Sequence, residues 1–438
     1  MKLKPIFLAT ILATSGWTQA ADLLETFHAA QANDPVYAAE RSKQLAGKEK
    51  LPQGRSLLLP TINLTANSTY NYQDSSLSGL THSNEFNSNG FGVSLVQPLF
   101  RQQNWLNYTE SELQVAQTEL QLKIAEQDLM LRVAQAYFDV LIAQDSVALV
   151  NAQKIAISEQ LEQAKRNFEV GSATITDTLE AQARYDLTGA QEIAAQSNLE
   201  IKRSALQQLI NTKPGELAPL GKEFKLEAPQ PPDMEEWVNQ AQMDSLQLAI
   251  AQAGAEIAAK EVSRNRGGHY PTVDLVANYS QNTNNGNNPT LGLGLDVTNK
   301  SVGVQLNMPI FQGGAVNSKL REAQANRERA LQDLENARRN VAQQTRQAYL
   351  GVFSGIAQVQ ALQNALTSSV SVLDASKLGH EVGVRTNLDV LNAQQQLFST
   401  RRDLYQAQYN YLLSELRLKQ AVGTLSEQDL GMINQALH

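Results

Sequence analysis

Apolar and polar residues alternate strictly in four short segments of this chain, whereas helical spacing dominates elsewhere. Ile62 and Leu64 alternate with Asn63 and Thr65, and the same period of two returns at about residues 91–97, 272–279 and 301–308. Because successive side chains of a strand point to opposite faces, the pattern predicts two pairs of strands, each with an apolar and a polar face. Polar loops rich in Ser, Asn, Gly and Thr, at about 73–90 and 281–300, are expected to join the strands of each pair.

The two faces of these strands are typical of a transmembrane barrel, with apolar side chains toward lipid and polar ones toward a wet lumen. A soluble sandwich packed against the helices is the alternative. Its dry core would leave the Asn, Asp and Gln side chains of the polar face without partners, so the lumen explains them better. Four strands cannot close around water, since even eight strands leave an interior that side chains fill. The chain is therefore expected to associate with copies of itself.

A long helix follows each pair of strands. Residues 101–169 contain neither proline nor glycine and carry leucines at seven-residue spacing, which predicts one helix of roughly 100 Å. The return helix Thr174–Asn211 is much shorter, so the helix at 34–59, with irregularities at Pro52 and Gly54, is expected to stack end to end with it beside the long helix. In the second half of the chain the matching segments are 313–381, 386–423 and 244–266. An isolated antiparallel coiled coil without a tunnel is the alternative.

The same architecture is encoded twice. Pro60, Gly92 and Phe100 recur 211 positions later as the same residue types, and Gly171 and Asp177 recur 212 positions later. The change of spacing from 211 to 212 positions corresponds to one inserted residue. So small a difference over this span indicates two copies of a single unit, and the repeat is too long for a stacked solenoid.

A repeated motif marks the turn between each long helix and its return helix. The pattern G-x-x-T-x-x-D-x-L-x-A begins at Gly171 and again at Gly383. Glycine accepts the left-handed conformation that ends a helix, and Thr or Asp can cap the exposed N–H groups of the next helix. Each copy is thus predicted to form the tip of a helical hairpin.

The remaining segments are shorter. Lys2 and Lys4, an apolar run and the small residue Ala20 predict a secretory signal over residues 1–20. After it, no apolar run approaches the roughly 20 residues of a membrane helix. Residues 213–232 read as a proline-punctuated connector, with a short strand expected at Lys222–Leu226, and residues 424–438 as a small terminal helix.

Composition and charge exclude several functions. Without Lys2 and Lys4, 34 basic side chains remain against 44 acidic ones, a net charge near −10 that makes nucleic acid a poor partner. The absence of cysteine excludes disulfides and thiolate metal sites. Four histidines are scattered without ligand spacing, at positions 28, 82, 269 and 438, and Gly292-x-Gly294 lies in a polar loop rather than before a helix. We expect no enzymatic activity, no cofactor and no metal.

Several motifs resemble those of the TolC family of outer-membrane efflux proteins. They are Leu59-Pro60-Thr61, Gln97-Pro98-Leu99-Phe100, Met308-Pro309-Ile310-Phe311-Gln312-Gly313-Gly314, Asn410-Tyr411-Leu412 and the two tip motifs. The resemblance spans nearly the whole chain after the signal. It implies a mixed α and β membrane protein that is a homotrimer, in which four strands of each chain form one 12-stranded transmembrane β-barrel continued by a long periplasmic α-helical barrel closed at the tips.

The resemblance also implies a division of the chain. Residues 60–100 and 268–312 would supply barrel strands and extracellular loops, residues 34–59, 101–211, 244–267 and 313–423 the helical barrel, and residues 22–33, 212–243 and 424–438 an equatorial belt.

The function implied by the resemblance is the exit duct of tripartite efflux pumps in the outer membrane of a Gram-negative bacterium, with type I secretion as a further role. Its cargo would be drugs, amphiphiles or proteins. Its partners would be a periplasmic adaptor protein, an inner-membrane transporter and outer-membrane lipid. Two other classes stay open on the residues: a trimeric structural or adhesive stalk whose polar loops bind outside partners, and a periplasmic adaptor, which the amphipathic strands disfavour.

The residues that match the family's lock at the tips are Thr176, Asp177 and Arg385, and the tyrosine of that lock is replaced here by His380. Charged and polar side chains of this kind can hold a tip closed and yet separate at modest cost. We hypothesise that His380, whose class titrates near neutrality, makes gating sensitive to mild acid.

Asp389 would form a carboxylate ring at the periplasmic entrance of a trimer, selective for cations. Asn392 stands where the family has a second aspartate, so we expect weaker block by multivalent cations than in the family. Without the resemblance, Asp177 and Asp389 are read as charges at helix N-termini, and Arg385 as a solvated residue at the tip.

Overall fold

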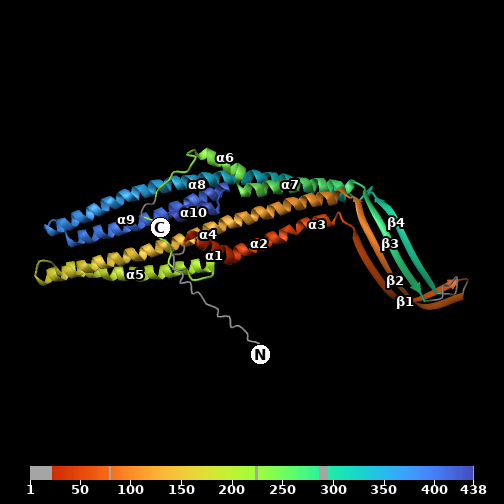
Figure 1. The fold of residues 1–438 in the computed structure, drawn as a ribbon, viewed down its shortest axis with the longest axis horizontal. Helices are drawn as coiled ribbons and strands as arrows, with labels where there is room; N and C mark the ends of the chain where they lie inside the picture. The colour runs from red at the N-terminus through yellow and green to blue at the C-terminus, as the bar shows by residue number, and fades with distance from the viewer. Residues whose placement is uncertain (1–21, 78–79, 222–224, 286–293, 438) are drawn as a thin grey trace, which may run out of the picture. The chain divides into compact units, whose positions relative to one another are not determined.

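The computed structural model describes residues 22–77, 80–221, 225–285 and 294–437. The predicted signal segment 1–20 lies outside these residues. So do the first three residues of the predicted strand Lys222–Leu226, while Lys225 and Leu226 belong to no strand. The elements follow in the order α1 (Leu23–Asn33), α2 (Pro35–Lys48), α3 (Lys50–Ser56), β1 (Thr61–Leu77), β2 (Leu80–Phe100), α4 (Gln102–Glu169), α5 (Ile175–Ile210), α6 (Met234–Asp244), α7 (Leu246–Arg266), β3 (Thr272–Asn284), β4 (Leu295–Asn307), α8 (Ala315–Glu381), α9 (Asn387–Val422) and α10 (Glu427–Gln435) (Figure 1).

The chain divides into two compact units, which are described separately. The hairpin unit comprises Met1–Ala38, Ala125–Met243 and Ala342–His438, and the sheet unit comprises Ala39–Ile124 and Asp244–Val341. The predicted repeat is visible in each of them, because each unit takes one segment of α4 and one segment of α8.

The four strands of the sheet unit form one antiparallel sheet in the order β1-β2-β3-β4. Ile62 lies opposite Leu95, Leu95 opposite Ala277, and Ala277 opposite Val302. Residues directly opposite one another in neighbouring strands share a face, so the apolar positions of all four strands gather on one side. The alternation predicted from the sequence is therefore confirmed.

The polar loops predicted at 73–90 and 281–300 are wrong in extent. β1 continues to Leu77 and pairs with β2 as far as Leu80, and β3 and β4 pair from Thr272↔Asn307 to Asn284↔Leu295. Polar residues extend the ladder because backbone bonds need no apolar side chain, and polar cross-strand pairs add to them: Asn71 Nδ2 donates to Ser88 Oγ at 2.8 Å. This correction shortens both of the polar loops on which the adhesive-stalk alternative depended.

The segment 34–59, predicted as one helix, is divided into α2 and α3. α2 ends at Lys48 and α3 begins at Lys50. Pro52 has no N–H to donate to the carbonyl of Lys48, four residues earlier, so the helical ladder is interrupted at this point.

Short helices lie beside the long one in the sheet unit, as predicted. α3 approaches α4 so closely that a Cβ added at Gly54 would come within 2.4 Å of Ser111 Oγ. α7 is joined to α4 by an ion pair between Arg264 Nε and Glu110 Oε1 at 3.2 Å. From the sequence, α7 was expected to lie beside the long helix of the second copy, α8. Its ion pair with α4, the long helix of the first copy, could be found only in the tertiary structure.

The middle of α4 forms the core of the hairpin unit. Leu129, Val133 and Tyr137 are completely buried, and the hydroxyl of Tyr137 accepts a hydrogen bond from the Ala218 N–H at 3.0 Å. One 18-residue window of α4 has a mean hydropathy of 1.3, which is high enough for a membrane span by composition alone, so the expectation that no such run exists was too strong. About two fifths of that window, 39%, is buried.

Helix α6 was not predicted from the sequence, which indicated only a connector at 213–232. The helix begins at Met234, directly after that connector. It buries Trp237, Val238 and Ala241, and Arg346 of α8 binds Glu235 through both Nε and Nη2 at 3.1 Å. Five prolines and two glycines punctuate the preceding segment 213–232, whereas the eleven residues of α6 carry only one short apolar face. Packing on α8 supplies the stability that so short a helix lacks by itself.

Candidate functional site at the helical hairpin tips

The two predicted hairpin tips have nearly the same backbone geometry. Gly171 has φ +74° and Gly383 has φ +79°, which is the left-handed region that glycine adopts without a steric penalty. In the first tip, the N–H of Ser172 returns to the carbonyl of Asn167 at 2.8 Å, and in the second the N–H of Val384 returns to Gly379 at 2.9 Å. These bonds satisfy the last carbonyls of α4 and α8.

The Thr and Asp of each motif form a capping box. Thr174 caps α5, where its Oγ1 accepts from the Asp177 N–H at 3.3 Å and its own N–H donates to Asp177 Oδ2 at 2.9 Å. Thr386 and Asp389 repeat the arrangement on α9, at 3.2 Å and 2.9 Å. The Thr and Asp of the motif therefore cap the N-terminus of the return helix.

The same bonds control the charge of the two carboxylates. Hydrogen bonds from the side chain and backbone of Thr174 lower the pKa of Asp177, and the nearby imidazole of His380 lowers it further when protonated. The backbone N–H and hydroxyl of Thr386 lower the pKa of Asp389, with a smaller contribution from Arg385. Both side chains are consequently anionic at neutral pH.

The structure brings the predicted lock residues together as two pairs rather than one cluster. His380 lies near Asp177, across the two hairpins. Arg385 Nη1 lies 3.9 Å from Asp389 Oδ1 on its own hairpin, and a Cβ at Gly379 would come within 2.7 Å of Arg385 Cγ, so that glycine makes room for the arginine stem. Thr176 is exposed on the first turn of α5.

Asn392 is engaged by a residue that the sequence did not single out. Arg184 of α5 donates from Nη2 to Asn392 Oδ1 at 2.8 Å and from Nη1 to Gln395 Oε1. Arg184 thereby joins the first hairpin to the second. An isolated arginine on an amphipathic helix carries no local signal of such a role, so its partners could be found only in the folded chain.

A cavity of about 510 Å³ lies between the hairpins next to this link. Residues of α4, α5 and α9 line it, among them Leu149, Arg184 and Gln394. Beneath the tips, each hairpin has its own small core, and the alanine that ends the motif is buried in both copies: Ala181 and Ala393. Small side chains at these positions let the outgoing and returning helices approach closely.

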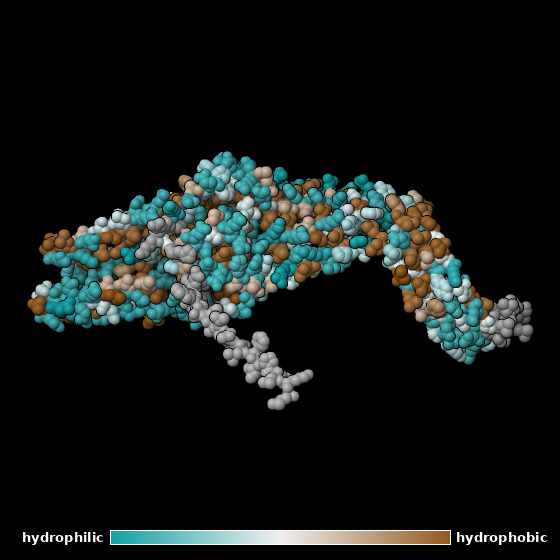
Figure 2. Space-filling model, viewed as in Figure 1, coloured by the Kyte–Doolittle hydropathy of each residue, from teal (hydrophilic) through white to brown (hydrophobic). Residues whose placement is uncertain are grey.

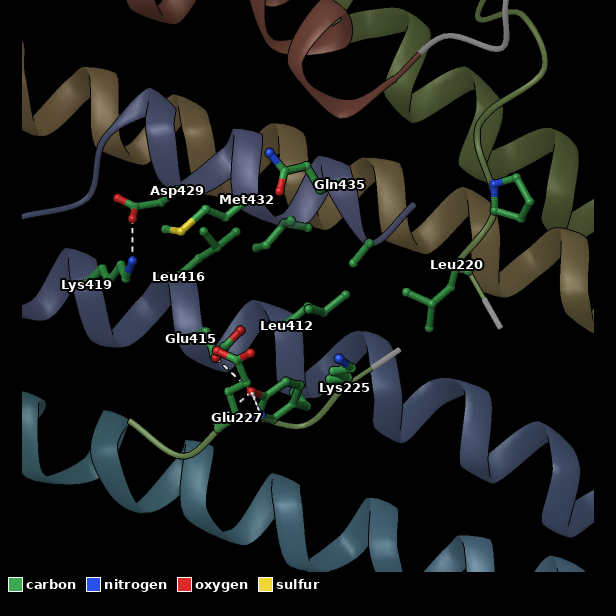
Figure 3. A pocket seen from close by; sticks show the side chains of 15 residues that line it. Leu220, Lys225, Glu227, Leu412, Glu415, Leu416, Lys419, Asp429, Met432 and Gln435 are labelled. Atoms are coloured by element: carbon green, nitrogen blue, oxygen red, sulfur yellow. Dashed lines mark hydrogen bonds and ion pairs between the residues drawn. The ribbon is translucent and has the colours of Figure 1, made fainter. Parts of the chain in front are cut away.

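A second polar cluster of the hairpin unit occupies the predicted equatorial region. Figure 3 shows Leu412 and Leu416 of α9 on the side of Met432 of α10, and the Glu415 side chain directed toward Glu227 of the connector.

The buried end of this pocket is closed by a tyrosine. Tyr411 Oη lies 2.7 Å from Glu415 Oε1 and accepts from the Glu227 N–H at 3.1 Å. Burial raises the pKa of Glu415, and only part of that rise is offset by Tyr411 and Lys419. Lys419 also pairs with Asp429 of α10, which ties the terminal helix to α9.

One face of the sheet is a candidate membrane surface. Figure 2 shows hydrophobic side chains gathered on the part of the sheet that adjoins the helices and hydrophilic ones toward the hairpin turns. Leu64 is 73% exposed and Val302 77%. Exposed aliphatic side chains in a continuous band are typical of a surface that a membrane or another protein covers. In the described parts of the chain, no group of three His, Asp or Glu side chains is placed to hold a metal ion.

The fold is shared with a solved channel-forming protein. The crystal structure of CusC, described as forming a transmembrane channel, matches 94% of this chain and 95% of its own with a TM-score of 0.78, at 17% sequence identity. An amphipathic four-stranded sheet combined with long helical hairpins thus defines the class.

Sequence comparison is more specific. The model of the outer membrane efflux protein family matches residues 26–212 and 237–424, one match for each copy of the repeat. The outer membrane protein TolC of Vibrio cholerae is 34% identical over 100% of this chain and 98% of its own length. The alkaline protease secretion protein AprF of Pseudomonas aeruginosa is 31% identical over 94% of this chain and 87% of its own. The chain belongs to the outer membrane efflux protein family, and it is an outer-membrane exit duct for efflux.

Proposed function

We propose that three copies of the chain form one duct, in which the four strands of each copy contribute to a closed 12-stranded barrel. The exposed apolar face of the sheet, together with its two open edges at β1 and β4, carries this proposal. Unpaired strand edges are not tolerated in lipid, because their N–H and C=O groups would have no partners. Pairing β4 of one copy with β1 of the next satisfies both edges at once.

In this assembly the helices would form a tunnel in the periplasm. Residues 34–59, 101–211, 244–267 and 313–423 would line it, and residues 22–33, 212–243 and 424–438 would encircle it as a belt. Apolar side chains left exposed on the two hairpins support further association: Val170 and Val384 at the tips are 77% and 76% exposed, and Ile193 in the middle of α5 is 70% exposed. Neighbouring copies and a periplasmic adaptor would cover them.

The tips would act as the gate. Arg184 links the two hairpins of one chain through Asn392, and His380 lies near enough to Asp177 to act on its charge. Opening would move the α8–α9 hairpin away from the α4–α5 hairpin and break these contacts. Asp389 would face the entrance as a ring of three carboxylates and favour cations.

The energy for export would come from an inner-membrane transporter, a partner that membership of the efflux protein family supports. Its cargo would include drugs and amphiphiles. Proteins exported by type I secretion are a further cargo, a role that the similarity to a protease secretion protein supports.

The trimer is tested by native mass spectrometry of the purified chain in detergent. We expect three times the mass of one chain, and a strictly monomeric protein would contradict the proposal.

The gate is tested with paired cysteines at Asp177 and His380, which are unambiguous because the chain has no cysteine of its own. Oxidation should abolish efflux of a dye from intact cells, and reduction should restore it.

A further inference from the structure

Lys300 is the single lysine or arginine within the four strands. It lies on the apolar face, because it is opposite Tyr279, which is opposite Val93, which is opposite Leu64. A charged side chain on such a face is costly at the middle of a bilayer and tolerated near its edges.

The neighbours of Lys300 along β4 place it at the edge of the apolar band. On the side toward the helices, the same face carries Val302, Val304 and Leu306, and on the side toward the hairpin turn it carries Thr298 and Asp296. Leu306 and Lys300 are separated by about 20 Å along the strand at about 3.3 Å per residue. This is close to the height of about 25 Å that is typical of the apolar band of an outer-membrane barrel.

A groove on the apolar face of the sheet lies beside Lys300. It is a shallow cavity of about 370 Å³. Its lining comprises Val93, Leu95, Ala277, Val302, the two residues above them, Tyr279 and Lys300, and also Asn278 and Ser301, which alternate with Ala277, Tyr279, Lys300 and Val302 along their strands. The small side chain of Ala277 creates the depression between its larger neighbours.

The ammonium group is held at the top of this groove. Lys300 Nζ lies 5.7 Å from the centroid of the Tyr279 ring, and the Tyr279 and Phe91 rings are 6.0 Å apart. A cation above an aromatic face is held there by the ring quadrupole. Asp296, the next acid on this face of β4, is about 13 Å away along the strand, too far for an ion pair.

We propose that this groove seats a phosphorylated lipid of the outer leaflet, with an acyl chain on Ala277 and the phosphate on Lys300. The inference rests on the proposed insertion of the sheet into the outer membrane. The helices leave the sheet at the opposite end from the hairpin turns, so the end of the band marked by Lys300 faces the cell surface. Each part of the groove matches a part of such a lipid. The apolar side chains suit the acyl chain, Lys300 suits the phosphate, and the aromatic ring of Tyr279 suits the boundary between acyl chains and headgroup.

The test is native mass spectrometry of the full chain in detergent, titrated with lipid A that carries its phosphates and with the same lipid after dephosphorylation. We expect wild type to prefer the phosphorylated lipid about fivefold, the effect of one cation near a lipid phosphate. Lys300→Gln should lose the preference and Lys300→Arg should retain it. Lys319→Gln removes the same charge from an exposed position of α8 and should change nothing.

Equal binding of the two lipids by wild type, or an undiminished preference in Lys300→Gln, would overturn the proposal. Insertion of wild type into liposomes is measured in parallel. A chain that inserts and conducts without discriminating the lipids refutes only the lipid site, whereas a chain that does not insert refutes the proposed function as well.

Discussion

The link made by Arg184 permits a quantitative prediction about the gate. Replacement by alanine removes the bonds from its guanidinium to Asn392 and Gln395. Hydrogen bonds from a charged donor contribute about 1.5–3 kcal/mol when shielded, and these are partly exposed, so we assign about 1 kcal/mol to the pair of bonds in each chain. Three chains opening together would then lose about 3 kcal/mol, which shifts the ratio of open to closed channels by roughly 100-fold.

Single-channel recording in planar bilayers measures this ratio directly. Arg184→Ala should open far more often than wild type and leave the conductance of the open state unchanged, because the strands are untouched. Arg203→Ala is the matched control, since Arg203 lies on the same helix and pairs only along it with Glu200. An open probability of Arg184→Ala equal to that of Arg203→Ala would show that Arg184 does not hold the tips together.

Three further predictions concern the tips. Gly383→Ala forces a side chain into a conformation with φ +79° and should destabilise that turn by about 1–2 kcal/mol, detected as faster hydrogen exchange in residues around it while the distant core is unchanged. The pKa values of Asp177 and Asp389 are lowered, so their stabilising contribution is present above the ordinary carboxyl pKa and is lost only as pH falls through the lower folded value. His380→Tyr should alter the response of gating to acid between pH 7.5 and 5.5, because an imidazole near Asp177 can carry a positive charge and a phenol cannot; identical profiles for wild type and His380→Tyr would disprove this. Asp389→Asn should weaken cation selectivity and block by a trivalent cation, and reversal potentials equal to wild type would remove Asp389 from the entrance ring.

Local features of the fold were predictable because their causes are local. Period-two alternation at Ile62 and Val302 depends on side chains a few residues apart, and it identified the strands and their apolar face. The turns at the two tips could likewise be predicted, because a left-handed glycine and a capping box each act within one turn of helix. Pro52 was recognised as an irregularity, although the helix breaks three residues before it, where the missing N–H leaves a carbonyl unpaired.

Errors arose where neighbours distant in sequence decide the structure. The polar ends of β1 and β2 were predicted as loops because their composition is that of a turn, and only the pairing of two such segments makes them strands. α6 was overlooked because its stability comes from α8, more than a hundred residues away, through the pair Arg346–Glu235. Within one chain Arg385 pairs with Asp389, a contact that the spacing of the lock residues did not indicate.

The amino-acid sequence by itself determined the repeat, the switch between helical and strand periods, the hairpin turns and the apolar face of the strands. These follow from backbone preferences and the amphipathic period, which act over one or two turns. Tertiary structure alone decided which side chains meet across the hairpins, such as Arg184 with Asn392, and which residues form the groove below Lys300. Such contacts join residues that are far apart along the chain, and a single sequence contains no period or spacing that records their distance in space.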